Sequence, residues 1–175
     1  MKNTPNVVFF APDGTCVVNP MQTAKIEQDI ARTFDLLGGE QTIQKPVRNS
    51  MEAHDLLMVG LPASALFFLT TQVLSLATTD VLDKAIGISV RTLQRRKNQA
   101  ADTPLSVEQS NRVWKFAEVL GRATQILGSR EDAEAWMSTP SIGLDQRKPL
   151  DLLATAVGLE AVESYLTRIE YGVYT

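Results

Sequence analysis

Basic side chains gather in one short stretch of the chain, between residues 80 and 101. Only Asp80 and Asp83 oppose them there. Guanidinium and ammonium groups bind phosphate, and a planar guanidinium can also contact guanine through two hydrogen bonds. The chemistry favoured here is therefore nucleic-acid binding. The basic residues are Lys84, Arg91, Arg95, Arg96 and Lys97.

The overall charge hides this stretch. The 175 residues include 17 Lys and Arg against 20 Asp and Glu, a formal net charge of −3, which by itself argues against a nucleic-acid partner. Counted by segment, the net charge is −2 for residues 1–79, +3 for residues 80–101 and −4 for residues 102–175. A basic segment thus lies between two acidic ones.

Residue types that support catalysis are scarce. His54 is the only histidine and Cys16 the only cysteine, which excludes a multi-histidine metal site, a multi-cysteine zinc site and an internal disulfide framework. Gly38-Gly39 lacks the lysine and the strand–loop–helix setting of a phosphate-binding loop. We expect no enzymatic activity, no cofactor and no metal.

The composition is that of a folded protein, with 44% hydrophobic and 21% charged residues. Residues 56–79 carry no charge and are long enough to span a membrane. Polar residues and Pro62 dilute this segment, so we interpret it as a buried helix. We expect a soluble cytoplasmic protein with no membrane partner.

The spacing around the basic segment predicts two short helices joined by a glycine turn. One helix ends at Ile86, the turn is Gly87-Ile88-Ser89, and the second helix begins at Val90. Glycine tolerates the positive φ of a sharp turn, and serine is a favoured helix cap. This arrangement is typical of a helix-turn-helix.

One residue departs from the usual pattern of that motif. Asp83 stands four positions before Gly87, where a small residue is usual. We expect Ala85 to make the close contact between the helices instead.

A helical wheel separates two sides of the second helix. At 100° per residue, Val90 and Leu93 lie on the buried side and Lys97 beside them, with the other basic residues opposite. We expect Arg91 or Arg95 to contact guanine, and the remaining polar residues to hold phosphates. One such motif makes few phosphate contacts, so useful affinity requires a homodimer on two half-sites. The expected DNA-binding residues are Ser89, Arg91, Thr92, Arg95, Arg96 and Lys97.

Hydrophobic periodicity elsewhere predicts an all-α body. An extended segment or small hairpin is expected in residues 1–19, and a linker in residues 40–50. The expected helices cover residues 20–37, 50–59, 62–76, 79–86, 90–97, 106–127, 129–136, 150–157 and 160–169, with a loop from Pro140 to Pro149.

The last expected helix stops near Gly172 and is followed closely by tyrosines. Tyr171 and Tyr174 offer a large contact area with few rotatable bonds, which suits an interface anchor. Packing of both rings back onto the domain is the alternative.

Four motifs in this order resemble antitoxins of the Xre/MbcA/ParS group. The resemblance covers residues 51–175, and it departs from the group at Asp145-Gln146, where paired glycines are common. The motifs are Gly60-Leu61-Pro62, Gly87-Ile88-Ser89-Val90-Arg91-Thr92-Leu93 with Arg95-Arg96, Pro149-Leu150-Asp151-Leu152-Leu153, and Arg168-Ile169-Glu170-Tyr171-Gly172-Val173-Tyr174.

The resemblance implies an Xre-like helix-turn-helix domain for DNA binding and dimerisation (50–128) and a small helical toxin-binding domain (129–175). Residues 1–49 lie outside the resemblance, and periodicity predicts that they form an N-terminal extension with one amphipathic helix. The resemblance also implies repression of the chain's own operon through operator DNA. It further implies a cognate RES-type toxin that depletes NAD and whose active site the C-terminal end blocks.

The toxin-binding residues that the resemblance assigns are Arg168, Glu170, Tyr171, Gly172 and Tyr174. An NAD pocket must hold a pyrophosphate, so Glu170 or the terminal carboxylate of Thr175 is suited to mimic that anion. Two alternatives remain: a free-standing transcriptional regulator whose C-terminal domain only mediates dimerisation, and a ParS-like localisation factor.

Overall fold

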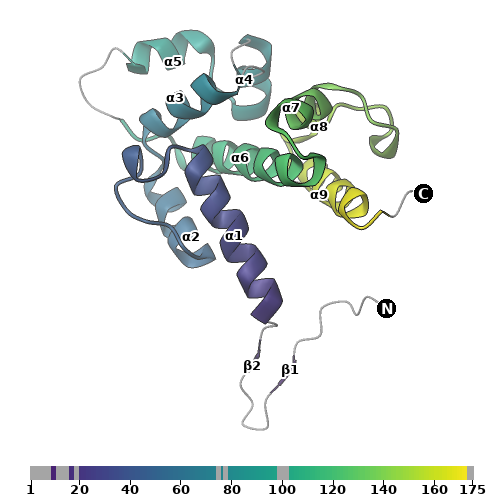
Figure 1. The fold of residues 1–175 in the computed structure, drawn as a ribbon. Coiled ribbons are helices and arrows are strands. Elements are labelled where there is room, and N and C mark those ends of the chain that lie inside the picture. Colours follow the sequence, from purple (N-terminus) through teal and green to yellow (C-terminus); the bar gives the residue numbers. More distant parts are fainter. Residues whose placement is uncertain are drawn as a thin grey trace.

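The computed structural model describes residues 9–10, 16–17, 20–73, 76, 79–97 and 103–172. These residues are mostly helical, so the predicted all-α fold is confirmed (Figure 1). The helices are α1 (Pro20–Leu36), α2 (Ser50–Val59), α3 (Ala63–Gln72), α4 (Thr79–Ile86), α5 (Val90–Lys97), α6 (Val107–Leu127), α7 (Arg130–Ser138), α8 (Pro149–Leu152) and α9 (Ala156–Glu170), with 3₁₀ turns η1 (Gly39–Gln41) and η3 (Ile142–Leu144).

The N-terminal part begins with a short antiparallel pair of strands, β1 (Phe9–Phe10) and β2 (Cys16–Val17), as the expectation of a small hairpin allowed. Helix α1 then starts at Pro20, whose fixed φ suits the first helical position. It ends before Gly38, which has a φ of 94° that glycine adopts at low cost.

Helix α6 lies at the centre of the fold and contacts α1, α2, α4, α7 and α9 (Figure 1). Its start is a capping box in which the Ser106 hydroxyl accepts from the Gln109 N–H and the Gln109 side chain accepts from the Ser106 N–H. Its end is Gly128, with a φ of 95°. The core face of α6 includes Val113 and Phe116, which are buried. One helix thus joins the early and late parts of the chain.

The uncharged segment forms α3, whose Leu66 and Leu69 are fully buried. No helix within the described ranges is long and apolar enough to cross a bilayer. The prediction that this helix continues to residue 76 is wrong, because α3 ends at Gln72 and Val73 has extended backbone angles. In the last turn of α3 the hydroxyl of Thr71 donates to the carbonyl of Phe68 at 2.7 Å.

The prediction of a linker over residues 40–50 is also wrong. Ile43 and Val47 are buried in the core, four positions apart. Because most residues of this segment are polar, its composition indicated a linker, although these two apolar residues anchor it. The segment packs onto the rest of the domain through them.

The last two helices have different bounds from those predicted. Helix α8 is a single turn ending at Leu152, and Thr155 caps α9 by accepting a 3.1 Å hydrogen bond from the Gly158 N–H. A side chain at position 158 would overlap the Leu152 carbonyl, so glycine permits this tight junction.

Candidate nucleic-acid interface and C-terminal interaction surface

The predicted glycine turn between α4 and α5 is confirmed. Gly87 has a φ of 75°, and its N–H donates to the Asp83 carbonyl at 2.9 Å, which closes α4. Ile86 and Ile88 on either side of the glycine are buried, as is Leu93 on α5. These contacts hold the two helices at the angle of the turn (Figure 1).

The unusual aspartate of the first helix is accommodated at the surface. Asp83 is exposed, so no charge is buried in the helix pair, and Ala85 is buried instead. The contact expected between Ala85 and the second helix stays a prediction.

The start of α5 is capped by Ser89. Its hydroxyl oxygen accepts from the Thr92 N–H at 3.2 Å and its hydroxyl group donates to the Thr92 Oγ1 at 3.0 Å. Ser89 is exposed and Thr92 half-buried, and the cap orders the N-terminal turn of the helix.

The exposed side of α5 is narrower than the wheel predicted. Arg91 and Arg95 are exposed, and Gln94 is exposed between them, a residue that the sequence analysis passed over. On the wheel Gln94 lies within about 60° of Arg91, which is the signal that could have found it. Arg91, Gln94 and Arg95 form one continuous polar face.

The prediction that Arg96 lies on the open side is wrong. Arg96 is half-buried, and within the described part of the chain its buried Nη1 has no hydrogen-bond partner. Helix α5 contacts α3 as well as α4, so a second flank of α5 is covered. Lys97 ends the helix, and its side chain lies outside the described residues.

At the other end of the chain, Arg168 holds a loop in place. Its Nη2 donates to the Gly143 carbonyl at 3.4 Å, and its Cζ lies 5.4 Å from the centre of the Tyr165 ring. Tyr165 stacks on Trp136 of α7 with ring centres 6.3 Å apart. The guanidinium and the two rings fix the loop that contains η3 against α9.

Two residues of that loop that are not glycine have a backbone conformation typical of glycine. Asp145 and Gln146 have φ angles of 53° and 60°, in the left-handed region. The Ser141 N–H donates to the Arg147 carbonyl at 3.1 Å and closes the loop. Ile142 is 84% exposed within it, an apolar surface residue that no periodicity in the sequence indicated.

Glu170 has two cationic partners in its own chain. One carboxylate oxygen accepts from Lys25 Nζ at 2.6 Å and the other from Arg122 Nη2 at 3.1 Å. Burial alone raises the pKa of Glu170, but the hydrogen bonds and charges of Lys25 and Arg122 outweigh it and lower the pKa below the ordinary value. The carboxylate thus joins α1, α6 and α9.

Tyr171 and Gly172 stand at the surface after α9. Tyr171 is 57% exposed, and Lys25 Nζ lies 5.9 Å from the centre of its ring. The Tyr171 ring therefore does not pack back into the domain, which was the alternative expectation. Tyr174 and Thr175 lie outside the described residues.

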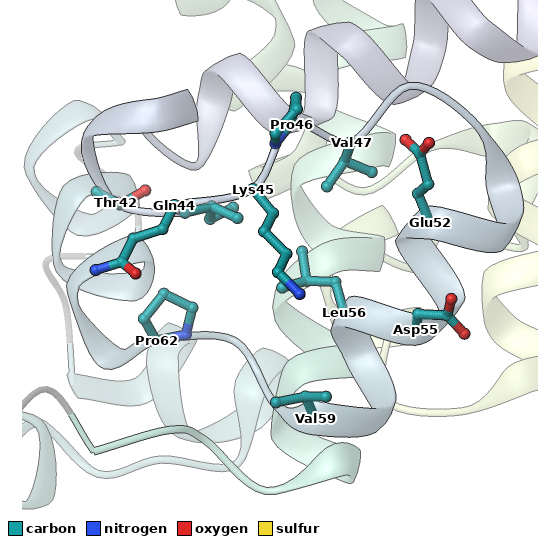
Figure 2. Close-up of a pocket in the computed structure, with 11 residues that line it drawn as sticks. Thr42, Gln44, Lys45, Pro46, Val47, Glu52, Asp55, Leu56, Val59 and Pro62 are labelled. Atoms are coloured by element: carbon teal, nitrogen blue, oxygen red, sulfur yellow. The ribbon is translucent and has the colours of Figure 1, made fainter.

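A hollow of about 470 Å³ lies between residues 42–47 and α2, away from α5 and the end of α9. Its walls are mainly aliphatic, and Figure 2 shows Lys45 lying across it with Glu52 and Asp55 on the α2 side. His54 is exposed on the same helix. Among the described residues, no group of three or more His, Cys, Asp or Glu side chains is placed to hold a metal ion.

Comparison with known proteins divides the chain at α6. Residues 52–118 match the family model of the antitoxin Xre-like helix-turn-helix domain, and residues 122–172 match that of the antitoxin Xre/MbcA/ParS C-terminal toxin-binding domain. A protein of Yersinia enterocolitica named antitoxin Xre is 33% identical, over 67% of this chain and 88% of its own length. This chain belongs to the Xre antitoxin family.

The resemblance drawn from the four motifs is therefore confirmed. A second antitoxin Xre, from Pseudomonas putida, is 32% identical over 49% of this chain and 52% of its own length. In this Xre-family chain, the turn at Gly87 and the exposed face of α5 belong to the helix-turn-helix domain. Arg168, Tyr171 and the η3 loop belong to the toxin-binding domain. Helix α6 runs from one domain into the other.

Proposed function

We propose that this antitoxin neutralises a RES-type, NAD-depleting toxin by blocking its active site, and that it represses its own operon as a DNA-bound homodimer. In this proposal residues 50–128 bind DNA and dimerise, and residues 129–175 bind the toxin. The protein acts in the cytoplasm as a binding protein, without a cofactor or a reaction of its own. The observation that carries the proposal is the exposed end of α9 in a toxin-binding domain.

The DNA-binding part of the proposal is supported by the face of α5. Arg91 and Arg95 suit guanine, and Gln94 between them suits adenine. The N-terminus of α5 suits a phosphate, because the first N–H groups of a helix have no partner within the helix. The Ser89 cap takes the Thr92 N–H, so the exposed Ser89 and the N–H groups before Thr92 are assigned to the phosphate. Arg96 and Lys97 are assigned to phosphates further along the helix.

The toxin-binding part divides the C-terminal residues into two roles. Arg168 and Glu170 position the surface, because each is bound to groups of its own chain. Tyr171 and Ile142 present exposed apolar area to a partner. Because Glu170 is neutralised by two cations, we assign the mimicry of a pyrophosphate to the residues beyond Gly172, where Tyr174 and Thr175 follow.

Toxin neutralisation is tested by co-expression with the protein encoded in the neighbouring reading frame, with cellular NAD as the readout. The full chain is expected to preserve NAD, and a chain lacking residues 171–175 to lose most of this protection. The Arg91→Ala/Arg95→Ala variant is the control, since it leaves the toxin-binding domain untouched. Full protection by the truncated chain would overturn the active-site block.

Operator binding is tested by titrating the purified chain onto DNA from upstream of its own reading frame. We expect Arg91→Ala and Arg95→Ala to weaken binding by about 1–3 kcal/mol each and to relax base preference. Arg147→Ala is the matched control, because Arg147 is an exposed arginine of the C-terminal loop. Intact operator binding without any binding of the neighbouring product would favour the free-standing regulator.

A further inference from the structure

Three large apolar side chains are exposed in the toxin-binding domain. Among the described residues that match its family model, the large apolar side chains with the greatest exposure are Ile142 at 84%, Val157 at 78% and Tyr171 at 57%. Exposed apolar side chains that gather on one side of a domain mark a surface for a partner. Two of these side chains belong to one face of α9, and the third is in the loop bound to that face.

The solvent face of α9 carries a regular stripe of residues. Its members follow the alternating four-and-three spacing of a heptad and lie within about 80° of one another at 100° per residue. The Tyr171 N–H donates to the Thr167 carbonyl at 3.1 Å, so the helical hydrogen bonding continues to this residue. The buried Val162 and Leu166 lie on the opposite side of the helix. The members of this stripe, which we call the α9 stripe, are Val157, Ala161, Ser164, Arg168 and Tyr171.

The charged member of the α9 stripe is engaged within its own chain. The guanidinium of Arg168 donates to the Gly143 carbonyl and lies over the Tyr165 ring. The same contacts attach the η3 loop to α9. Ile142 directly precedes Gly143, so its exposed side chain lies beside the stripe. The stripe and the loop therefore form one surface that is mainly uncharged.

The middle of the α9 stripe has small side chains. Ala161 and Ser164 are both exposed, with Val157 before them and Tyr171 after them. In helix packing, the side chains of one helix fill the spaces between those of the facing helix. Small residues in the middle of the stripe leave room for such side chains. This pattern therefore fits a helix with an apolar face that lies along α9.

We propose that the α9 stripe, with Ile142 at its flank, is the docking surface for an apolar helix of the toxin. The matched family model is that of a toxin-binding domain, which favours the toxin as the occupant of this surface. The inference rests on the proposed function and deepens it. It separates docking along α9 from the block of the active site, which is assigned to residues beyond Gly172.

The test measures the dissociation constant between the full chain and the protein encoded in the neighbouring reading frame. Ala161→Glu places a charge in the middle of the α9 stripe. The matched control is Ala156→Glu, the same substitution at an exposed alanine of α9 that lies about 140° away around the helix. We expect about a tenfold or greater loss of affinity for Ala161→Glu, because burying a charge in an apolar contact is costly. The control should change the affinity by less than about twofold.

A second variant of the α9 stripe, Ser164→Glu, should lose affinity in the same way as Ala161→Glu. All three variants are expected to keep the unfolding temperature of the parent, since they change exposed positions on a helix. The mass of each variant is measured by light scattering alongside its affinity.

Two results would overturn the inference and leave the proposed function intact. One is that Ala161→Glu and Ser164→Glu bind the toxin as tightly as Ala156→Glu. The other is that the mass of the two stripe variants falls to that of a single chain while that of Ala156→Glu does not, which would assign the stripe to self-association. If the unmodified chain does not bind the neighbouring product, the proposed function fails and the inference fails with it.

Discussion

The ammonium of Lys25 lies 2.6 Å from the carboxylate of Glu170, although 145 positions separate the two residues in the chain. Arg122 reaches the second oxygen of the same carboxylate from the central helix α6. One side chain thus connects the N-terminal extension, the helix shared by both domains and the helix that leads to the toxin-binding end. This junction and the loop beside it can be tested directly.

Replacing Glu170 by glutamine is expected to reduce the pH dependence of stability. The pKa of Glu170 is lowered in the folded chain, so its contribution is fully present above the unfolded pKa and is lost as the pH falls through the folded one. Urea unfolding between about pH 6 and pH 3 should show a smaller loss for Glu170→Gln than for the parent. At neutral pH the substitution itself should lower the free energy of unfolding by about 1 kcal/mol or less, because the ion pairs of Glu170 are partly solvated.

Glu160→Gln is the control, since Glu160 is exposed on the same helix. Its stability should follow the parent across the whole pH range. Parallel curves for the parent and Glu170→Gln would show that the junction adds no pH-dependent stability.

Gly143→Ala is expected to destabilise the chain by about 1–3 kcal/mol. A Cβ at this position would overlap the Tyr165 ring, which is held between Trp136 and Arg168 and cannot move freely. Thermal unfolding of Gly143→Ala, Tyr165→Ala and the double variant measures the coupling. The double variant should cost no more than Tyr165→Ala alone, and simple additivity would disprove the proposed overlap.

Gln146→Gly is expected to stabilise the chain by about 0.5–1 kcal/mol. The left-handed φ of Gln146 destabilises the folded chain by roughly 1–2 kcal/mol when the residue has a side chain. Glycine removes this strain, but it also raises the entropy of the unfolded chain, which offsets part of the gain. Chemical unfolding should show the gain. Lys148→Gly is the control, because Lys148 has an ordinary φ of −75°, and this variant should show no gain. An equal change in the free energy of unfolding of both variants would show that the backbone of Gln146 is not strained.

Ser110→Ala is expected to cost about 1–3 kcal/mol of unfolding free energy. The fully buried Ser110 hydroxyl oxygen accepts a 2.8 Å hydrogen bond from the Leu61 N–H, which would otherwise be buried without a partner. Ser50→Ala, at an exposed position on α2, should be close to neutral in the same urea titration. A Ser110→Ala variant as stable as Ser50→Ala would mean that the N–H finds another acceptor.

Local features of the fold were predictable from the residues alone. The capping residues Ser89, Ser106 and Ser129 and the stop at Gly128 act over three or four positions, so their effects can be recognised in the sequence. The helix-turn-helix spacing around Gly87 belongs to the same class, because it depends on short-range steric and hydrogen-bonding rules.

The candidate sites were predictable only in part. The wheel identified Arg91 and Arg95 as exposed, but it placed Arg96 beside them because a wheel contains no neighbouring helix. Arg96 is half-buried in the folded chain, in which α5 contacts both α3 and α4. In the same way, the composition of residues 40–50 did not show that Ile43 and Val47 reach the core.

The sequence by itself determined the all-α character and the basic face of one helix, because these follow from periodicity and spacing within a few turns. The order of the two domains followed from the resemblance of its motifs to a known family. Tertiary structure alone decided that Lys25 and Arg122 neutralise Glu170, and that α1 lies beside the end of α9. Such contacts depend on which helix faces pack against each other, and that choice is made by the burial of many side chains together.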